Sequence, residues 1–321
     1  MKLPDLLENA IENEVSKYDI KVLKEKALNL SNRYMTEERK GKTFINDFLV
    51  AVAYSVIRMP ATYSAIRESL EKTLEIYNPG IKSVLDIGSG TGAAEWVIDD
   101  ILDVDDITCL EREKDMRDIS KTYFSYNENL KSVKFIDADI LKEDLNLKKD
   151  LCILSYMINE LDESKRLEIV KKALNATNKI MLIVEPGTPE GFNNIKKIRD
   201  FAYEEGYSII APCTGFCGRC DIKEDDWCAS SIRVQRTKIH KYLKDADVPF
   251  EDEKFSYIAI SKEKIDLNDN EYLRILRHPK IENGRVTVKL CQNGEVIEKV
   301  ITKKDKELFK KVKKKNIGDI V

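Results

Sequence analysis

The residues Val84–Ala93 constrain the fold of this chain more than any other stretch, because they join an apolar run to a glycine-rich turn. The run Ser83–Ile87 has the length and β-branched content of a buried strand. Alternating glycines follow it, and the chain then takes on helical character. Strand, glycine turn and helix build the nucleotide sites of doubly wound α/β folds, because glycines admit a ligand close to the backbone and to N–H groups at the helix start. The glycines are Gly88, Gly90 and Gly92.

The acid before the glycines narrows the class of nucleotide. Gly88-x-Gly90-x-x-Ala93 also fits a relaxed dinucleotide fingerprint, so the glycines alone do not decide. Asp86 lies two residues before the first glycine, where a carboxylate would repel a pyrophosphate. S-adenosylmethionine carries an ammonium and a sulfonium and no phosphate, so it suits an acid there. The pattern Asp-x-Gly-x-Gly-x-Gly resembles the first motif of class I methyltransferases. A glycine turn in a domain that binds no nucleotide is the alternative.

From Ile81 onward, strand-like and helix-like segments alternate, as a parallel sheet requires. We therefore predict an α/β fold, a class I methyltransferase (Rossmann-like) doubly wound sheet that binds its ligands along the carboxyl ends of the strands. Helices are expected over Ala93–Leu102, Glu163–Leu174 and Asn193–Glu205, with a rigid loop over Glu185–Phe192. The expected strands are Ser83–Ile87, Ile107–Leu110, Val133–Ile136, Leu151–Ser155, Ile180–Val184 and Tyr207–Ala211.

Acidic residues after the second and third expected strands suit the two ends of an adenosine. Glu111 lies about 20 residues past the glycines, where a ribose-hydroxyl acceptor is expected, and a solvated charge is the alternative. Asp139 is placed to accept from an adenine amino group, with Asp137 as the fallback. The residues predicted to bind S-adenosylmethionine are Asp86, Gly88, Ser89, Gly90, Gly92, Glu111, Asp139 and Ser155.

The sequence identifies no catalytic residue. Amino-group methylases of the common type carry Asn/Asp-Pro-Pro-Tyr after the fourth strand, whereas this chain has Ser155-Tyr156-Met157-Ile158. A 5-methylcytosine enzyme needs a cysteine nucleophile on the loops after the fourth or fifth strand, but Cys152 falls inside a strand.

Periodicity and composition divide the chain into a helical N-terminal lobe, a methyltransferase domain with a cysteine-rich metal-binding segment, and a basic C-terminal extension of β-hairpin and helix. Pro60 is expected to break the helices of the lobe. The lobe is expected to cap the sheet, and the alternative is a surface that meets a polyanion through Lys40, Lys42 and Arg58. The three parts are residues 1–78, 79–261 (with the metal-binding segment at 211–230) and 262–321.

Charge and hydropathy exclude several classes of protein. The formal net charge is −3, so the chain as a whole has no nucleic-acid signature, and any such contact must come from local patches. No stretch approaches the roughly 20 apolar residues of a membrane span, and the N-terminus lacks a signal-peptide core. We expect a cytoplasmic protein with no membrane partner. The 7 cysteines then favour metal or redox chemistry over disulfides, so no disulfide partner is expected.

Four cysteines lie between Cys213 and Cys228, a density that is typical of a metal site. Zinc sites use paired Cys-x-x-Cys knuckles, and only Cys217 and Cys220 form one, so the uneven spacing favours an iron–sulfur cluster, with zinc as the alternative. The first three cysteines also have the spacing of radical S-adenosylmethionine enzymes. Those enzymes resemble TIM barrels with the motif on an early loop, whereas this triplet comes late, so that interpretation is less favoured.

The C-terminal region is expected to contact RNA. A helix over Ser231–Leu243 and a strand over Phe255–Ser261 precede a hairpin of Arg285–Cys291 and Glu295–Ile301, whose Asn-Gly turn is a strong signal. A lysine-rich helix ends the chain, and a solvated surface is the alternative role for its charges. Arginines nearby favour the RNA contact. These cations are Arg274, Arg277, Arg285, Lys303, Lys304, Lys306, Lys310, Lys311, Lys313, Lys314 and Lys315.

Six short motifs occur in one order, namely Arg58–Tyr63, Val184–Phe192, Ala211–Cys213, Asp226–Cys228, Phe250–Tyr257 and Gly318–Asp319. Together they resemble the methyltransferase-like assembly factors of the mitochondrial small ribosomal subunit and their bacterial relatives, over most of the chain. The resemblance implies a class I fold, a [4Fe–4S] cluster, and contact with small-subunit ribosomal RNA or an assembly intermediate. It places the cluster on Cys213, Cys220, Cys228 and the distant Cys291. The chain departs from the family pattern by carrying Cys217, an alternative ligand.

Together, these features predict an S-adenosylmethionine-dependent ribosomal RNA methyltransferase that is associated with small-subunit assembly and carries a [4Fe–4S] cluster. One alternative is a non-catalytic assembly or RNA-binding factor that retains the cofactor fold. A radical S-adenosylmethionine enzyme or another redox enzyme is less favoured.

Overall fold

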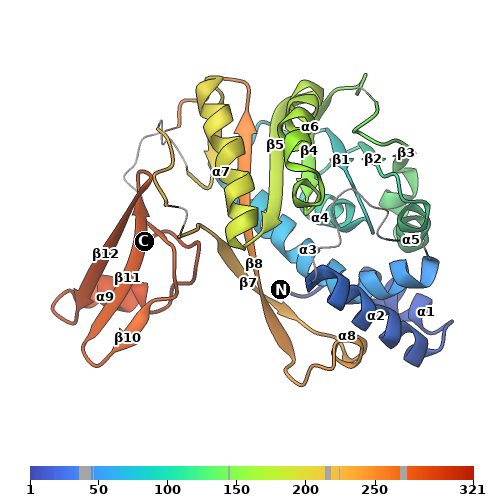
Figure 1. Cartoon of the computed structure of the whole chain (residues 1–321), viewed down its shortest axis with the longest axis horizontal. Coiled ribbons are helices and arrows are strands. Elements are labelled where there is room, and N and C mark those ends of the chain that lie inside the picture. The colour runs from blue at the N-terminus through green and yellow to red at the C-terminus, as the bar shows by residue number, and fades with distance from the viewer. Residues whose placement is uncertain (36–44, 46, 144, 214–217, 224, 268–272) are drawn as a thin grey trace. The chain divides into compact units, whose positions relative to one another are not determined.

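The computed structural model describes residues 1–35, 45, 47–143, 145–213, 218–223, 225–267 and 273–321 (Figure 1). The chain divides into two compact units, each made of two segments. The first unit contains Met1–Val184 and Ile232–Glu253, and the second contains Glu185–Ser231 and Lys254–Val321. The three-part division that the sequence suggests stays a prediction.

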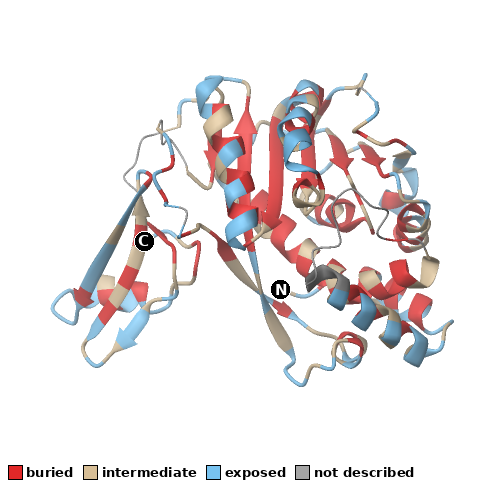
Figure 2. Cartoon of the chain, viewed as in Figure 1, coloured by how far each residue is buried: buried red, intermediate tan, exposed pale blue. Residues whose placement is uncertain are grey.

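A parallel sheet forms the centre of the first unit. Its strands lie in the order β3-β2-β1-β4-β5, and each neighbouring pair is parallel. Most residues of β1, β2, β4 and β5 are buried, as Figure 2 shows in red, because helices cover both faces of such a sheet. The α/β doubly wound fold predicted from the sequence is therefore confirmed. The strands are β1 (Ser83–Ile87), β2 (Asp106–Leu110), β3 (Lys134–Ile136), β4 (Lys149–Ser155) and β5 (Thr177–Pro186).

The strand order reverses between β1 and β4, and this reversal creates the ligand crevice of the fold. The chain runs outward from β1 through β2 to β3, then returns to β4 and continues to β5. Right-handed crossovers therefore place α4 and α5 on one face of the sheet and α6 on the other. The connecting helices are α4 (Ala93–Ile101), α5 (Lys114–Phe124) and α6 (Glu163–Ala176), and short 3-10 turns lie at Glu128–Ser132 and Ile158–Glu160.

The N-terminal residues are helical, as their periodicity predicts. They form α1 (Asp5–Val15), α2 (Ile20–Met35) and α3 (Phe48–Ile76). Helix α3 packs against α4 and α5, and it also contacts α1 and α2. A buried hydrogen bond of 2.6 Å between the hydroxyls of Ser55 and Tyr123 joins α3 to α5. The lobe is therefore part of the same packed layer as the helices that follow β1 and β2.

The break predicted at Pro60 is wrong, because α3 continues through this residue. A proline inside a helix costs about 3 kcal/mol, since it removes one backbone hydrogen bond and crowds the preceding turn. Met59, Pro60, Ala61 and Tyr63 are all buried, so the packing of the whole helix offsets that cost. Burial of this kind is a tertiary effect that the local sequence does not reveal.

Helix α3 is also the helix among the described residues that is long and apolar enough to cross a membrane. The sequence analysis predicted no stretch with the length and apolar composition of a membrane span, and by these two criteria that prediction is wrong. In the structure, 78% of its most apolar 18-residue window is buried within the protein. A core helix of a folded domain has the same character, so this helix is weak evidence for a membrane span.

The helix predicted over Ser231–Leu243 is wrong in its first half and confirmed in its second. The chain instead forms strand β7 (Ser230–Gln235), which pairs with β8 (Phe250–Ser261), and then the short helix α8 (Lys238–Leu243). Thr237 separates them, because its hydroxyl accepts a hydrogen bond from the His240 N–H and so starts α8. Pairing with β8, which follows later in the chain, therefore decided the conformation of the first half of the predicted helix.

The second unit begins with α7 (Pro189–Glu204) and β6 (Ser208–Ala211), and β6 is antiparallel to β8. The rigid loop predicted over Glu185–Phe192 is shorter than expected, because α7 already begins at Pro189. The Thr188 hydroxyl caps α7 by accepting from the Gly191 N–H at 3.1 Å. A side chain at Gly191 would lie 2.1 Å from the Pro186 carbonyl oxygen, so only glycine allows this tight entry into the helix.

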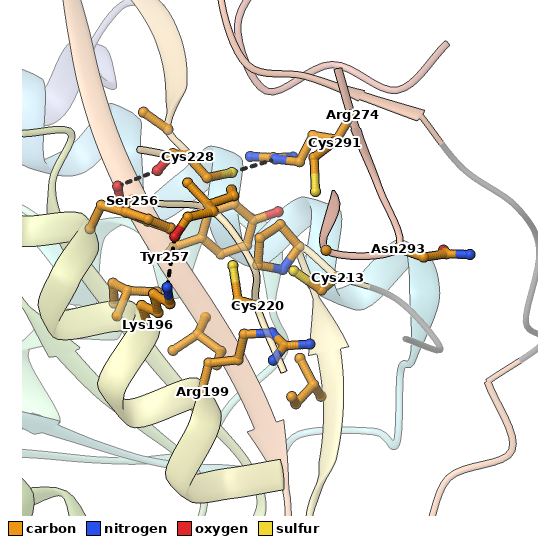
Figure 3. A pocket seen from close by; sticks show the side chains of 18 residues that line it. Lys196, Arg199, Cys213, Cys220, Cys228, Ser256, Tyr257, Arg274, Cys291 and Asn293 are labelled. Carbon is orange, nitrogen blue, oxygen red and sulfur yellow. Dashed lines mark hydrogen bonds between the residues drawn. The ribbon is translucent and has the colours of Figure 1, made fainter. Parts of the chain in front are cut away.

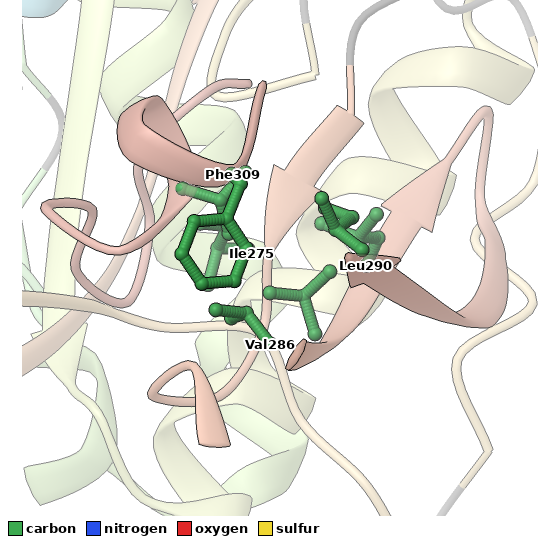
Figure 4. Packing of buried hydrophobic residues seen from close by; sticks show 7 residues of the cluster. Ile275, Val286, Leu290 and Phe309 are labelled. Atoms are coloured by element: carbon green, nitrogen blue, oxygen red, sulfur yellow. The ribbon is translucent and has the colours of Figure 1, made fainter. Parts of the chain in front are cut away.

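A separate antiparallel sheet and a helix close the second unit. The strand order is β10-β11-β12, and β9 pairs with β11. The predicted hairpin is confirmed, and its turn has φ of 47° at Asn293 and 83° at Gly294, as an Asn-Gly turn between twisted strands requires. Figure 4 shows the apolar core beneath it, where Phe309 from α9 packs with Ile275, Val286 and Leu290. The elements are β9 (Leu273–Ile275), β10 (Lys280–Glu282), β11 (Arg285–Gln292), β12 (Glu295–Thr302) and α9 (Lys306–Val312).

Candidate functional site

A hollow of about 1210 Å³, measured out to open solvent, lies at the carboxyl ends of the parallel strands of the first unit. Its walls come from the turns that follow β1, β2, β3 and β4, together with parts of α3 and α5. This is the crevice that the reversal of strand order predicts. Six of the eight predicted cofactor-binding residues line it, and they are Gly88, Ser89, Gly90, Glu111, Asp139 and Ser155.

The glycine turn is held by its own backbone hydrogen bonds. The N–H groups of Gly88 and Ser89 donate to the Leu110 carbonyl at 2.7 and 3.4 Å, and the Gly92 N–H donates to the Ser89 carbonyl at 3.0 Å. The Gly90 N–H donates to Glu111 Oε2 at 2.9 Å. These four amides of the turn are therefore engaged within the protein, whereas the sequence suggested that amides would face the ligand.

Two of the glycines have distinct steric roles. Gly92 has φ of 84°, and a Cβ there would lie 2.6 Å from the Phe124 ring, so Gly92 allows α4 to pack against α5. Gly92 does not line the hollow. Gly90 has φ of 55° and does line it, and a Cβ at Gly90 would have only the Gly88 carbonyl oxygen within 4.0 Å. Gly90 therefore faces open space, where a ligand can approach the backbone.

Glu111 holds the glycine turn and faces the hollow. Its two carboxylate oxygens accept hydrogen bonds from the N–H groups of Gly90 and of Glu113, at 2.9 and 2.7 Å. Burial raises the pKa of Glu111, and these two hydrogen bonds act against the rise. Each carboxylate oxygen can accept a second hydrogen bond, so the position suits a ligand hydroxyl group.

The structure separates the two candidate acids after β3. Asp139 lines the hollow, and its Oδ1 accepts from the Leu141 N–H at 3.0 Å. Asp137 does not line the hollow and instead pairs with Arg117 at 2.7 Å. Met116, Ile140 and Leu141 add apolar surface near Asp139, and such a surface suits one face of a flat aromatic ring. Asp139 is thus the better placed of the two for contact with a base.

Asp86 lies outside the hollow, fully buried next to Glu95. Burial and the neighbouring Glu95 charge raise the pKa of Asp86 well above its usual value. Glu95 Oε1 in turn accepts from the Cys109 thiol at 2.8 Å. A carboxyl group in these surroundings favours its neutral form, so the repulsion of a pyrophosphate cannot rest on Asp86 and must come from acids that face the hollow.

Tyr156 also lines the hollow. The sequence patterns predict no role for this residue. It follows β4 with φ of 56°, a left-handed conformation that is unusual for a tyrosine and concentrated at functional sites. Its hydroxyl donates to Glu253 Oε1 at 2.8 Å, and the Arg58 guanidinium lies 5.6 Å from its ring centre. Its position at the carboxyl end of β4, next to the switch point, was the signal available in the sequence.

A second hollow, of about 670 Å³ out to open solvent, lies within the second unit. Figure 3 shows Cys213, Cys220, Cys228 and Cys291 around it, although Cys291 is far from the others in sequence. Cys213 follows β6, Cys228 precedes β7 and Cys291 lies on β11. These are the four cysteines that the family resemblance selects, and Cys217 lies outside the described residues.

Burial opposes the ionisation of three of these thiols, those of Cys220, Cys228 and Cys291. Burial, and then the charge of neighbouring cysteines, raises the pKa of Cys291 to about 12. Burial raises the pKa of Cys220 to about 11, and it also raises the pKa of Cys228. A bound cationic centre would reverse this balance, because it stabilises several thiolates at once. The donor set therefore fits a thiolate-ligated metal group.

The described residues contain no group of three or more His, Cys, Asp or Glu side chains placed to hold one metal ion. A tetrahedral zinc ion needs Zn–S distances of about 2.3 Å, which brings its ligand sulfurs close together. The four thiols here share a hollow without reaching that arrangement. The six cysteines that the structure describes are all free thiols.

Two of the arginines assigned to a basic RNA-contacting region have another place in the structure. Arg274 is buried, and its Nε donates to Cys228 Sγ at 3.2 Å. Arg277 pairs with Asp226 and lies over the Trp227 ring. The lysines around α9 are different, because they are exposed and form no ion pair among the described residues. The exposed lysines are Lys303, Lys304, Lys306, Lys310, Lys311, Lys313 and Lys314.

Solved structures of methyltransferases share low similarity with this chain. A proposed RNA methyltransferase from Pyrococcus horikoshii is 17% identical, with 75% of this chain and 99% of that chain covered and a TM-score of 0.44. The magnesium protoporphyrin IX methyltransferase of Synechocystis PCC 6803, solved with bound S-adenosylmethionine, is 12% identical, with 77% and 98% covered and a TM-score of 0.41. No curated protein matches the chain in sequence.

A family model gives the stronger result. Residues 49–321, most of the chain, match the family described as mitochondrial small ribosomal subunit Rsm22. The match includes the glycine turn, the residues around the first hollow from Tyr54 onward, and the four cysteines of the second hollow. This protein belongs to the Rsm22 family.

Proposed function

We propose that this protein is an S-adenosylmethionine-dependent RNA methyltransferase that acts on the small ribosomal subunit or its assembly intermediates. The observation that carries the proposal is the position of Glu111, which faces the crevice while it fixes the glycine turn. A carboxylate at the end of the second strand suits the ribose hydroxyls of an adenosine. Asp139 and the apolar side chains beside it suit the adenine ring.

Charge in the first hollow favours S-adenosylmethionine over a dinucleotide. More acids than bases line it, so its field suits the sulfonium and ammonium of S-adenosylmethionine and opposes a pyrophosphate. The engaged amides of the glycine turn also leave a pyrophosphate fewer donors to bind. The charged residues that line the hollow are Glu111, Glu113, Asp139, Glu160 and Asp162, and Arg112 and Lys165.

The partner is proposed from the family and from the basic surface. The description of the Rsm22 family names the mitochondrial small ribosomal subunit, so ribosomal RNA is the polyanion proposed here. The exposed lysines around α9 have no competing carboxylate among the described residues and are available for phosphate contacts. A non-catalytic RNA-binding factor would use the same lysines, so the methyl-transfer experiment separates the two functions.

We further propose that Cys213, Cys220, Cys228 and Cys291 hold a [4Fe–4S] cluster. Each thiolate of such a cluster binds a different iron, so the four sulfurs surround a hollow and do not converge on one point. Four thiols around one cavity fit that requirement better than they fit a single zinc ion. Bound there, the cluster would tie β11 to the segments that follow β6 and precede β7.

The first prediction tests the cofactor and the reaction. The wild-type protein should bind S-adenosylmethionine in calorimetry and transfer a tritiated methyl group to small-subunit particles. Gly90→Val should abolish both, because the side chain would occupy the open space in front of the turn. Gly80→Val is the matched control, since Gly80 also has a positive φ (69°) and no atom within 4 Å, and it does not line the hollow. Cofactor binding without methyl transfer would support the non-catalytic alternative.

The second prediction concerns Glu111. Glu111→Gln should weaken S-adenosylmethionine binding by about 1.5–3 kcal/mol, because it removes a charged acceptor and turns an amide N–H towards a backbone donor. Asp137→Asn is the control, since it makes the same chemical change outside the hollow. Calorimetric affinities that are equal for both variants would contradict a cofactor role for Glu111.

The third prediction tests the RNA surface. Lys310, Lys311 and Lys313 should each be replaced by Gln, because deletion of α9 would also remove the buried Phe309 and Val312. We expect the plot of log affinity for small-subunit RNA against log salt concentration to become less steep by roughly 2–3. The reason is that each phosphate contact releases about one counterion on binding, and three such contacts are lost.

The control for this surface is a triple Lys→Gln variant of Lys82, Lys131 and Lys134, which are exposed lysines of the first unit with carboxylate partners. Filter binding over a range of ionic strength measures both slopes. If the two triple variants have the same slope, the lysines around α9 are only a solvated surface.

The fourth prediction tests the cluster. Protein purified without oxygen should contain iron and sulfide, with the broad visible absorption of a [4Fe–4S] cluster. Cys291→Ser should lower the iron content and expose residues 262–321 to protease, because a ligand on β11 is lost. Cys217→Ser should do neither unless Cys217 is a ligand. Full iron loading of Cys291→Ser would show that the other cysteines suffice.

A further inference from the structure

Arg274 is an unusual charge to find in the interior of the second unit. It lies on β9 and is 3% exposed. A buried guanidinium is costly unless charges or hydrogen bonds compensate it. Among the described residues Arg274 forms no ion pair with a carboxylate, so the compensation must come from other groups.

The hydrogen-bond acceptors of Arg274 are a sulfur and two neutral oxygens, and its guanidinium also lies over the Tyr257 ring, 6.0 Å from the ring centre. Its Nε donates to Cys228 Sγ at 3.2 Å, its second terminal nitrogen donates to Ser230 Oγ at 2.9 Å, and its first donates to the Gly318 carbonyl at 2.6 Å. In the antiparallel pairing of β9 with β11, Arg274 also lies directly opposite Cys291. Figure 3 shows the guanidinium beside Cys228 and close to Cys291. The cation therefore adjoins two of the four thiols.

The same arginine ties the end of the chain to the cysteine site. The Gly318 N–H donates to the Ile275 carbonyl at 2.8 Å, and the Ser231 N–H donates to the Ile317 carbonyl at 3.2 Å. A Cβ at Gly318 would lie 2.6 Å from Ser230 Oγ, so glycine is required for this close approach. Arg274, Gly318 and Ser230 thus form one buried set of contacts next to Cys228.

We propose that Arg274 is the positioning residue of the four-cysteine site, where its positive charge balances the thiolates and its hydrogen bonds fix Cys228. The proposal rests on the [4Fe–4S] cluster proposed above. Outer-shell donors to a ligand sulfur orient the ligand and tune the metal centre.

The charge of Arg274 predicts a specific effect on the cluster. Reduction adds one electron, supplied in the experiment by dithionite, to a cluster that is already anionic with its four thiolates. A buried positive charge stabilises the more negative, reduced form more strongly. Removing that charge should therefore shift the reduction potential to a more negative value.

The experiment compares three variants of the full chain, purified without oxygen. Arg274→Gln removes the charge and keeps a polar group, and Arg274→Lys keeps the charge but loses the planar fork. Arg285→Gln is the matched control, because Arg285 is an exposed arginine on β11 that pairs with Glu282. The readouts are iron per chain, the rate of iron loss to a chelator, and the potential from a dithionite titration followed by electron paramagnetic resonance.

We expect Arg274→Gln to lose iron to the chelator about 10–100-fold more readily and to have a more negative potential than the wild type. Arg274→Lys should retain a potential close to that of the wild type, and Arg285→Gln should match the wild type in all three readouts. A folded Arg274→Gln protein with unchanged iron retention and potential would overturn the proposal. Equal shifts of potential in the Gln and Lys variants would overturn the charge role and leave only a structural one.

Failure of the cluster and failure of the Arg274 proposal give different results. If the wild-type chain holds zinc and no iron, the cluster proposal is wrong. Arg274 is then tested by the zinc affinity, measured by chelator competition. Weaker zinc binding in Arg274→Gln than in Arg285→Gln would support the positioning role, and equal affinities would overturn it.

Discussion

The hydrogen bond from the Gly90 N–H to the Glu111 carboxylate joins the turns that follow the neighbouring strands β1 and β2, at the wall of the crevice of the first unit. It fixes a turn whose glycines have left-handed conformations, and it holds a charged acceptor at the wall of the hollow. The other wall residues take their positions from the parallel sheet that carries both strands. This interaction therefore helps to fix the turn and also holds one of the charges that a ligand meets.

The second unit depends on a balance of charge. Four thiols and two arginines line one hollow, and burial opposes the ionisation of three of these thiols. Arg274 offsets part of the negative charge that ligation would create, and its contacts reach the chain end at Gly318. In this proposal, the contacts of Arg274 connect the metal ligand Cys228 with the β9–β12 sheet and with the segment around Gly318.

Local patterns predicted the parallel strands well, because each is a short apolar run bounded by turn residues. They failed where long-range pairing decided the outcome. Ser231–Leu243 has helical periodicity over part of its length, yet its first residues pair with β8 as strand β7. Pro60 is a helix breaker by itself, yet α3 passes through it because both sides of the proline are buried. In both cases tertiary contacts outweigh a local preference.

The sequence by itself determined the fold class, the glycine turn, the acid at the end of β2 and the cysteines that could share a site, because spacing and residue type carry that information. Only the tertiary structure showed that Asp86 is buried next to Glu95 outside the hollow, that Asp139 and not Asp137 faces the hollow, and that Arg274 donates to Cys228. These outcomes depend on burial and on neighbours that are distant in sequence. A linear pattern shows which groups are present, and only the packed chain decides which of them meet.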